Sequence, residues 1–160
     1  MKNRTLIALI ALTSFLISGG VFIASQKPAA SCVTVYVDYG VLEAHKTTTE
    51  CVRTDGTLRG MDALNMAGVA ILGTEKYGLQ IACRVNGVPD ALTPIPATGH
   101  EGYLEKCKDM PAEFAYWAII VRDGSNPWGW AQTGLLDIKL KPGDSIGLVY
   151  AINENVRFPN

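Results

Sequence analysis

Alternating hydrophobic and polar positions predict a β-hairpin near the N-terminal end of the folded region. Val33, Val35 and Val37 alternate with Thr34, Tyr36 and Asp38. This period of two is typical of a half-buried strand. Gly40 ends the pattern, and residues 47–52 have the composition of a short returning edge strand. A turn near residues 41–42 would join the two strands.

A second alternation predicts a hairpin near the C-terminus. Leu136, Ile138 and Leu140 alternate with charged residues, and residues 142–144 read Pro-Gly-Asp, a turn signal. Ile146, Leu148, Tyr150 and Ile152 then repeat the alternation and predict the returning strand.

Between the hairpins, one segment has the periodicity of a helix. Leu58, Met61 and Leu64 share one stripe over residues 58–67, after possible capping residues at 54–57 and before Gly68. Gly60 costs such a helix about 1 kcal/mol relative to alanine. We therefore expect a short helix held by packing.

The remaining strands are expected around turns rich in glycine and proline. Residues 69–72 and 79–85 are apolar enough for strands, and Asn86-Gly87 is a tight-turn signal. Residues 90–102 contain two prolines and two glycines and predict an irregular loop.

All three tryptophans lie in residues 115–134. The apolar run at 117–121 predicts a buried strand, with Trp117 in the core. Turn-forming residues at 122–127 reverse the chain. If residues 128–132 are extended, Trp128, Trp130 and Gln132 project from one face. Two interpretations stay open for this face: a platform for a flat ligand, or the lid of a hydrophobic core.

The N-terminal segment predicts export. Lys2 and Arg4 precede an uncharged, mostly apolar stretch from Leu6 to Ala24, the pattern of a secretory signal. Its length approaches the roughly 20 residues that span a bilayer, so an uncleaved signal-anchor is the alternative. We divide the chain into a signal peptide or signal-anchor (1–25), a linker (26–31), one folded domain (32–153) and a tail (154–160). We expect the protein to be extracellular or membrane-anchored.

Four cysteines follow this leader and predict two disulfides in an exported chain. None forms a Cys-x-x-Cys pair, and neither histidine has ligand spacing to a cysteine, so no metal site is expected. Three pairings exist. We favour Cys32–Cys51, because the first hairpin sets these two residues opposite each other, together with Cys83–Cys107, which would restrict the irregular loop.

No catalytic motif is present. His45 and His100 lack an adjacent serine or cysteine motif, and neither zinc-protease nor phosphate-loop signatures occur. We expect no enzyme activity and no cofactor. The absence of a basic cluster argues against nucleic-acid binding.

The order of these elements resembles the transcobalamin-like C-terminal domain of exported bacterial proteins. The matching pieces are the segment 33–40, the helix around 62–64, the segment 83–89, Tyr116-Trp117, Trp128-Gly129-Trp130 and the segment 141–146. The resemblance implies an α+β, β-grasp-like fold, with one short helix packed on a mixed or antiparallel sheet. It also implies a non-catalytic module, with cobalamin or a related corrinoid as a ligand by analogy alone.

Two functions follow as expectations. The first is a small-molecule-binding module for a corrinoid or another flat ligand, with a pocket between Trp128, Trp130 and the Cys83–Cys107 loop. The candidate ligand-binding residues are Trp128, Trp130, Gln132, Tyr116, Tyr103, Arg84 and Asn86. The second is a membrane-anchored structural or protein-interaction module at the cell surface, meeting a protein partner through residues 47–52 or the tryptophan face.

Overall fold

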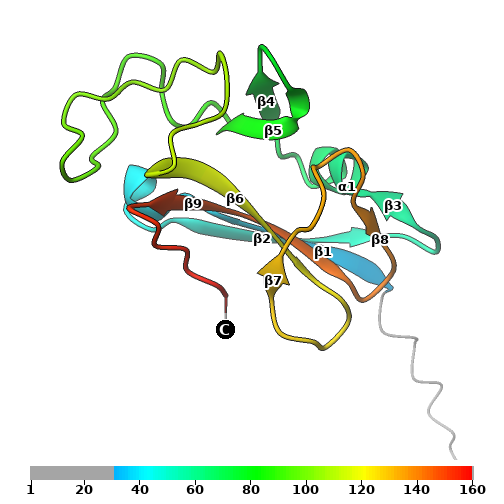
Figure 1. The fold of residues 1–160 in the computed structure, drawn as a ribbon. Helices are drawn as coiled ribbons and strands as arrows, with labels where there is room; N and C mark the ends of the chain where they lie inside the picture. Colours follow the sequence, from blue (N-terminus) through cyan, green and yellow to red (C-terminus); the bar gives the residue numbers. More distant parts are fainter. Residues whose placement is uncertain (1–30, 160) are drawn as a thin grey trace, which may run out of the picture.

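The computed structural model describes residues 31–159. The expected leader, its apolar stretch and nearly all of the linker lie outside these residues. Nine strands, one α-helix and one 3-10 helix follow in this order: β1 Cys32–Asp38, η1 Gly40–Glu43, β2 Thr47–Arg53, β3 Leu58–Arg59, α1 Gly60–Met66, β4 Ile71–Thr74, β5 Gly78–Val85, β6 Ala115–Arg122, β7 Gly129–Trp130, β8 Lys139–Leu140 and β9 Ser145–Ile152 (Figure 1). Over residues 31–159, the α+β class with a single short α-helix is confirmed. No helix in residues 31–159 is long and apolar enough to cross a membrane.

The main sheet has five strands in the order β2-β1-β9-β6-β7. Only β1 and β9 run parallel, and the other neighbours are antiparallel. The β1–β2 hairpin predicted from the alternating valines is confirmed, with Val35 opposite Glu50.

The predicted C-terminal hairpin is wrong. The turn at residues 142–144 forms, but the strands on either side of it have different partners. β8 pairs with β3, while β9 enters the main sheet between β1 and β6. Every residue of β9 except Ile152 is buried, because neighbours cover both faces of this central strand. Leu136, which the alternating pattern places among the apolar positions of a strand, is 40% exposed, whereas its neighbour Leu135 is fully buried.

The helix starts later than its periodicity predicts. Leu58 and Arg59 form the short strand β3, and α1 begins at Gly60 without a side-chain cap. A Cβ atom at Gly60 would lie 3.1 Å from the Cβ of Ile138 and from the Cδ1 of Ile146. Glycine is therefore tolerated here because α1 comes close to Ile138, just before β8, and to Ile146 of β9, which outweighs its poor helix propensity.

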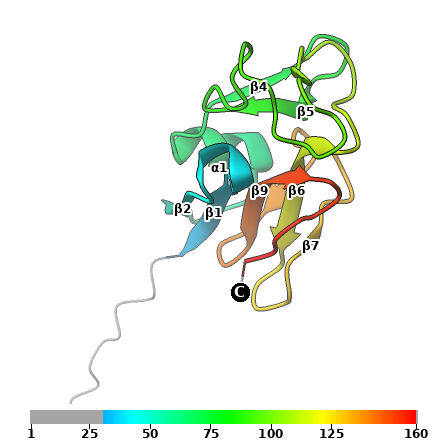
Figure 2. The same cartoon turned by 90° about the vertical axis from the view of Figure 1, so that its left-hand side faces the viewer.

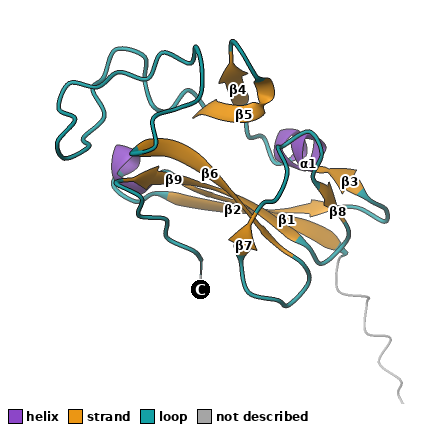
Figure 3. Ribbon diagram, viewed as in Figure 1, coloured by secondary structure: helices purple, strands orange, loops and turns teal. Residues whose placement is uncertain are grey.

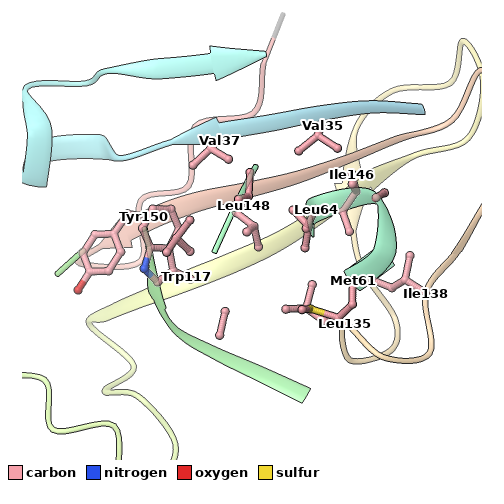
Figure 4. Packing of buried hydrophobic residues seen from close by; sticks show 14 of the residues in the cluster. Val35, Val37, Met61, Leu64, Trp117, Leu135, Ile138, Ile146, Leu148 and Tyr150 are labelled. Carbon is pink, nitrogen blue, oxygen red and sulfur yellow. The ribbon is translucent and has the colours of Figure 1, made fainter. Parts of the chain in front are cut away.

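The core fills the space between one face of the main sheet and α1 (Figure 4). Valines of β1 and alternate residues of β9 face Met61 and Leu64 of α1, and Trp117 with Tyr150 closes one end of this layer. The β4–β5 ribbon lies on the same side of the sheet as α1 (Figure 2). A long connection without regular structure runs from β5 to β6 (Figure 3), as the prolines and glycines predict.

Both predicted disulfides are present. Cys32–Cys51 joins β1 to β2, with Cα atoms 5.5 Å apart, and Cys83–Cys107 joins β5 to the long loop, with Cα atoms 5.6 Å apart. These distances lie within the usual range for a disulfide. The second bridge holds the end of the irregular loop beside β5.

Candidate functional site

A pocket of about 600 Å³ lies between β5 and β6. Ile81 and Ala82 of β5 form one side, and Tyr116, Trp117 and Ile119 of β6 form the other. The segment Met110–Glu113, Trp130 and Glu154 complete the lining. This volume falls in the range of pockets that bind small organic ligands, and such pockets are mostly apolar with a few polar groups.

Trp130 is the most exposed aromatic residue of this pocket. It is 46% exposed and is the last residue of β7. The ring of Phe158 packs edge-on against it, with 5.8 Å between ring centroids. Because the C-terminal segment supports one side of the indole, a ligand would meet a ring that is already partly oriented.

The opposite wall comes from the segment that follows the second disulfide. Met110 is 58% exposed and lies three positions after Cys107. The backbone N–H of Glu75 donates to Cys107 O at 2.7 Å, and that of Lys76 donates to Lys108 O at 3.1 Å. The disulfide and these two bonds hold the wall against the β4–β5 ribbon. Methionine is an adaptable contact surface for apolar ligands.

Trp128 lies elsewhere, on the face of the main sheet opposite α1. Its ring centroid is 6.1 Å from that of Tyr36 on β1, and the guanidinium carbon of Arg122 is 5.1 Å from the Trp128 ring centroid. Gly147 lies beneath it, since a Cβ atom there would be 3.4 Å from Cζ3 of Trp128. Trp128 is half-buried and covers the sheet, which agrees with the lid interpretation for this residue.

Trp117 is a core residue, as predicted. It is 5% exposed, its Nε1–H donates to Val88 O at 3.0 Å, and it packs edge-on against Tyr39 and Tyr150. Figure 4 shows Trp117 beside Tyr150.

Gln132 lies apart from the pocket. Its Nε2 donates to Trp130 O at 3.0 Å, and its side chain lines a separate hollow of about 330 Å³ with Asp137 and Asp144. The expected common face of Trp128, Trp130 and Gln132 does not form around one cavity, because β7 is only two residues long.

Arg84 and Asn86 are both engaged in holding loops. Arg84 Nε donates to Pro89 O at 2.8 Å, and its Nη2 donates to Glu105 O at 2.7 Å. Asn86 accepts from the Ala70 backbone N–H through Oδ1 at 2.8 Å, and its Nδ2 donates to the hydroxyl of Tyr39 at 2.7 Å. These bonds fix the start and end of the long loop.

Tyr103 forms a hydrogen-bonded pair with the buried Glu105 and is itself half-buried. Its hydroxyl donates to Glu105 Oε2 at 2.8 Å, while Glu105 Oε1 accepts from the Cys107 backbone N–H at 2.7 Å. Burial, helped by the Glu105 carboxylate, raises the pKa of Tyr103 to about 12. The phenol is therefore neutral at physiological pH and serves as a hydrogen-bond donor.

Glu105 also lies near the sulfur atoms of Cys83 and Cys107, in a group that has metal-ligand residue types. Both sulfur atoms are joined in the disulfide, and a disulfide sulfur is not the thiolate that binds metals. In the oxidised protein the Glu105 carboxylate instead serves Tyr103 and the Cys107 N–H.

Of the seven candidate residues, the structure brings Trp130 and Tyr116 to the pocket between β5 and β6. Sequence reasoning missed its other contributors, chiefly Ile81, Met110, Glu113 and Glu154. The only sequence signal for them was indirect: Met110-Pro111 is an apolar pair that follows the disulfide-bonded loop and lies outside any strand pattern.

No protein-family model, no curated protein and no solved structure matches this chain. The assignment of a role therefore rests on the geometry of the pocket and on the residues that line it.

Proposed function

We propose that this chain is an exported, non-catalytic module that binds a small ligand in the pocket between β5 and β6. The observation that carries the proposal is the cavity of about 600 Å³ beside Trp130. A large exposed indole on the surface of a secreted domain is commonly a contact residue. The two disulfides support export, because such bonds persist in oxidising compartments.

The fold proposed for this module is the β-grasp. The first hairpin, the single helix after it and the final strand placed parallel to β1 at the centre of the sheet support that assignment. The likeness to transcobalamin-type domains extends the proposal to a corrinoid as one candidate ligand. A pocket of this size would enclose part of such a macrocycle, and its aromatic lining suits flat ligands in general.

The test is a titration of the oxidised protein with a panel that includes cobinamide, flavins and other flat metabolites. Calorimetry measures affinity, and the difference in fluorescence between wild type and Trp130→Phe isolates the signal of this one indole. We expect Trp130→Ala to weaken binding of any hit by about tenfold or more, because a central aromatic contact is lost.

Leu92→Ala is the matched control, since Leu92 is 85% exposed and does not line the pocket. It should bind as wild type does. A hit that binds Trp130→Ala with unchanged affinity would place the site elsewhere. Binding by no member of the panel would contradict the small-molecule proposal.

A second candidate function is a membrane-anchored protein-interaction module, and one observation favours it. β2 is an edge strand of the main sheet, and all of its residues except Thr48 and Val52 are exposed. Exposed strand edges pair with other chains. Recovery of the protein only in the culture medium, with an N-terminus near Gln26, would contradict the anchored form.

A further inference from the structure

The backbone of β6 has one edge that its neighbours leave partly open. Asn153 N–H donates to Phe114 O at 2.8 Å, which fixes the hydrogen-bonding phase of β6 against β9. In an antiparallel ladder such bonds fall on alternate residues. Residues 116, 118, 120 and 122 therefore bond to β9, and residues 115, 117, 119 and 121 direct their N–H and C=O groups to the other edge.

β7 covers only the second half of that edge. It pairs with β6 at Ile120 and Val121, and Ala131 N–H donates to Ile119 O at 3.0 Å. At the start of β6, Ala115 N–H donates to Ala112 O at 3.0 Å. Between these points, the N–H and C=O of Trp117 and the N–H of Ile119 have no hydrogen-bond partner within the described part of the chain.

These open backbone groups lie at the pocket, because Trp117 and Ile119 both line it. Trp117 is a buried residue overall, at 5% exposed. Buried backbone donors and acceptors are nearly always paired in native proteins. An occupant with its own peptide groups would satisfy them.

The charge of the pocket adds a second constraint on the occupant. Among residues 31–159, Glu113 and Glu154 are its only charged lining residues, and no lysine, arginine or histidine lines it. Both glutamates are exposed at the rim. The charge is therefore complementary to a cationic group, and unfavourable for an anionic one.

From these observations we infer that the pocket binds an extended peptide segment that carries a basic side chain. The peptide adds to the open edge of β6 beyond the end of β7 and pairs with the N–H and C=O of Trp117. Its basic side chain lies toward Glu113 and Glu154, and an apolar side chain contacts Trp130. This is strand addition, in which backbone bonds give affinity and side-chain contacts give selectivity. The inference rests on the proposed function and names the ligand class of the same pocket.

The experiment uses ¹⁵N-labelled oxidised protein and three blocked hexapeptides, Ac-Thr-Val-Xaa-Val-Thr-Ser-NH₂, where Xaa is lysine, norleucine or glutamate. Norleucine keeps the aliphatic chain of lysine and removes its charge. The readout is the change in hydrogen exchange at the Trp117 and Ile119 amides on adding peptide, because a hydrogen bond to a bound strand slows exchange at the amide that donates it. We expect the lysine peptide to slow exchange of the Trp117 amide by roughly tenfold or more at saturation, and the affinities to fall from lysine to norleucine to glutamate.

Charge variants test the rim. Glu113→Gln with Glu154→Gln should weaken the lysine peptide by about threefold to tenfold and leave the norleucine peptide unchanged. Glu50→Gln is the matched control, since Glu50 is exposed on β2, at the far edge of the sheet. It should change neither affinity.

Three results would overturn the inference: peptide binding without protection at Trp117, a glutamate peptide that binds as well as the lysine peptide, or no response to any peptide at about 1 mM. If flat metabolites bind in a Trp130-dependent way while the edge amides stay unprotected, the small-ligand function stands and the peptide inference fails. If neither peptides nor metabolites bind, both fail.

Discussion

Replacing Gly147 with alanine tests how closely Ile120 packs against the central strand of the sheet. Gly147 lies in the central strand β9, on the face opposite α1. A Cβ atom there would lie 2.7 Å from Cγ1 and 3.0 Å from Cδ1 of Ile120, and 3.4 Å from Cζ3 of Trp128. Ile120 is fully buried, so its β-branched side chain has little freedom to move aside.

Two effects of opposite sign set the magnitude. Glycine inside a strand costs about 0.5–1 kcal/mol in chain entropy, which alanine would recover. Overpacking a filled site costs about 1–3 kcal/mol. Because the 2.7 Å approach involves a buried atom next to the Ile120 branch point, the second effect wins. We expect Gly147→Ala to lower the free energy of unfolding by about 1–2 kcal/mol, which corresponds to a fall in Tm of about 4–8 °C.

Urea unfolding of the oxidised protein, followed by tryptophan fluorescence and circular dichroism, measures this change. Gly129→Ala is the matched control. Gly129 also lies in a strand of the main sheet, but a Cβ atom there meets nothing within 4 Å. This variant should be as stable as wild type or slightly more stable. The emission of native Gly147→Ala should stay close to that of wild type, because Cζ3 of Trp128 lies at ordinary contact distance and the close approach is to Ile120.

A Gly147→Ala variant that matches or exceeds the stability of wild type would refute close packing of Ile120 against Gly147. A red shift of the native emission would contradict the placement of the strain on Ile120, since Trp128 would then have moved as well. A double variant with Ile120→Val supplies a further check. The cost of Ile120→Val should be smaller when Gly147→Ala is also present, because the deleted Cδ1 is one of the clashing atoms.

Two other predictions concern the long loop. Removing the Cys83–Cys107 bridge with Cys83→Ser and Cys107→Ser should lower the free energy of unfolding by about 3 kcal/mol, since the two cysteines are 24 residues apart. Urea midpoints of the oxidised proteins measure this, and a change below about 1 kcal/mol would contradict the tethering role. The pKa of Tyr103 is raised to about 12, so the folded protein holds the phenol proton more tightly than the unfolded chain does. The stabilisation of the fold by the neutral phenol is therefore fully present below pH 10, the usual pKa of tyrosine, and is lost as the pH rises toward about 12. The difference in ultraviolet titration between wild type and Tyr103→Phe detects the Tyr103 phenolate, and Glu105→Gln should lower the pKa of Tyr103. A wild-type Tyr103 that titrates near the usual tyrosine pKa of about 10 would contradict the hydrogen-bonded pair of Tyr103 and Glu105.

The strands that the sequence predicts well are those whose neighbours follow directly along the chain. β1 and β2 pair as a local hairpin, so alternating valines and a turn were sufficient to place both. The same local information placed Cys32 opposite Cys51. Asn86-Gly87 likewise forms its tight turn, with both residues at positive φ.

The C-terminal prediction failed because strand pairing there is not local. The turn at 142–144 has the right residues, yet β9 pairs with β1, from the other end of the domain, and with β6. Alternation along one strand shows which residues face one side and carries no information on which strand lies beside it. For the same reason, helix propensity alone does not explain the glycine at position 60, where Ile138 and Ile146, both distant in the chain, leave no room for a larger side chain.

The sequence by itself determined the local features of this protein: strand periodicity, one short helix, the irregular loop, two disulfides and the concentration of tryptophan in and after β6. The tertiary structure alone decided what each tryptophan does. Trp117 enters the core, Trp128 covers Gly147, and Trp130 stays exposed beside Met110 and the open edge of β6. The physical reason is that an indole packs against whatever surface lies within its reach, and for all three rings that surface comes from segments distant in the chain.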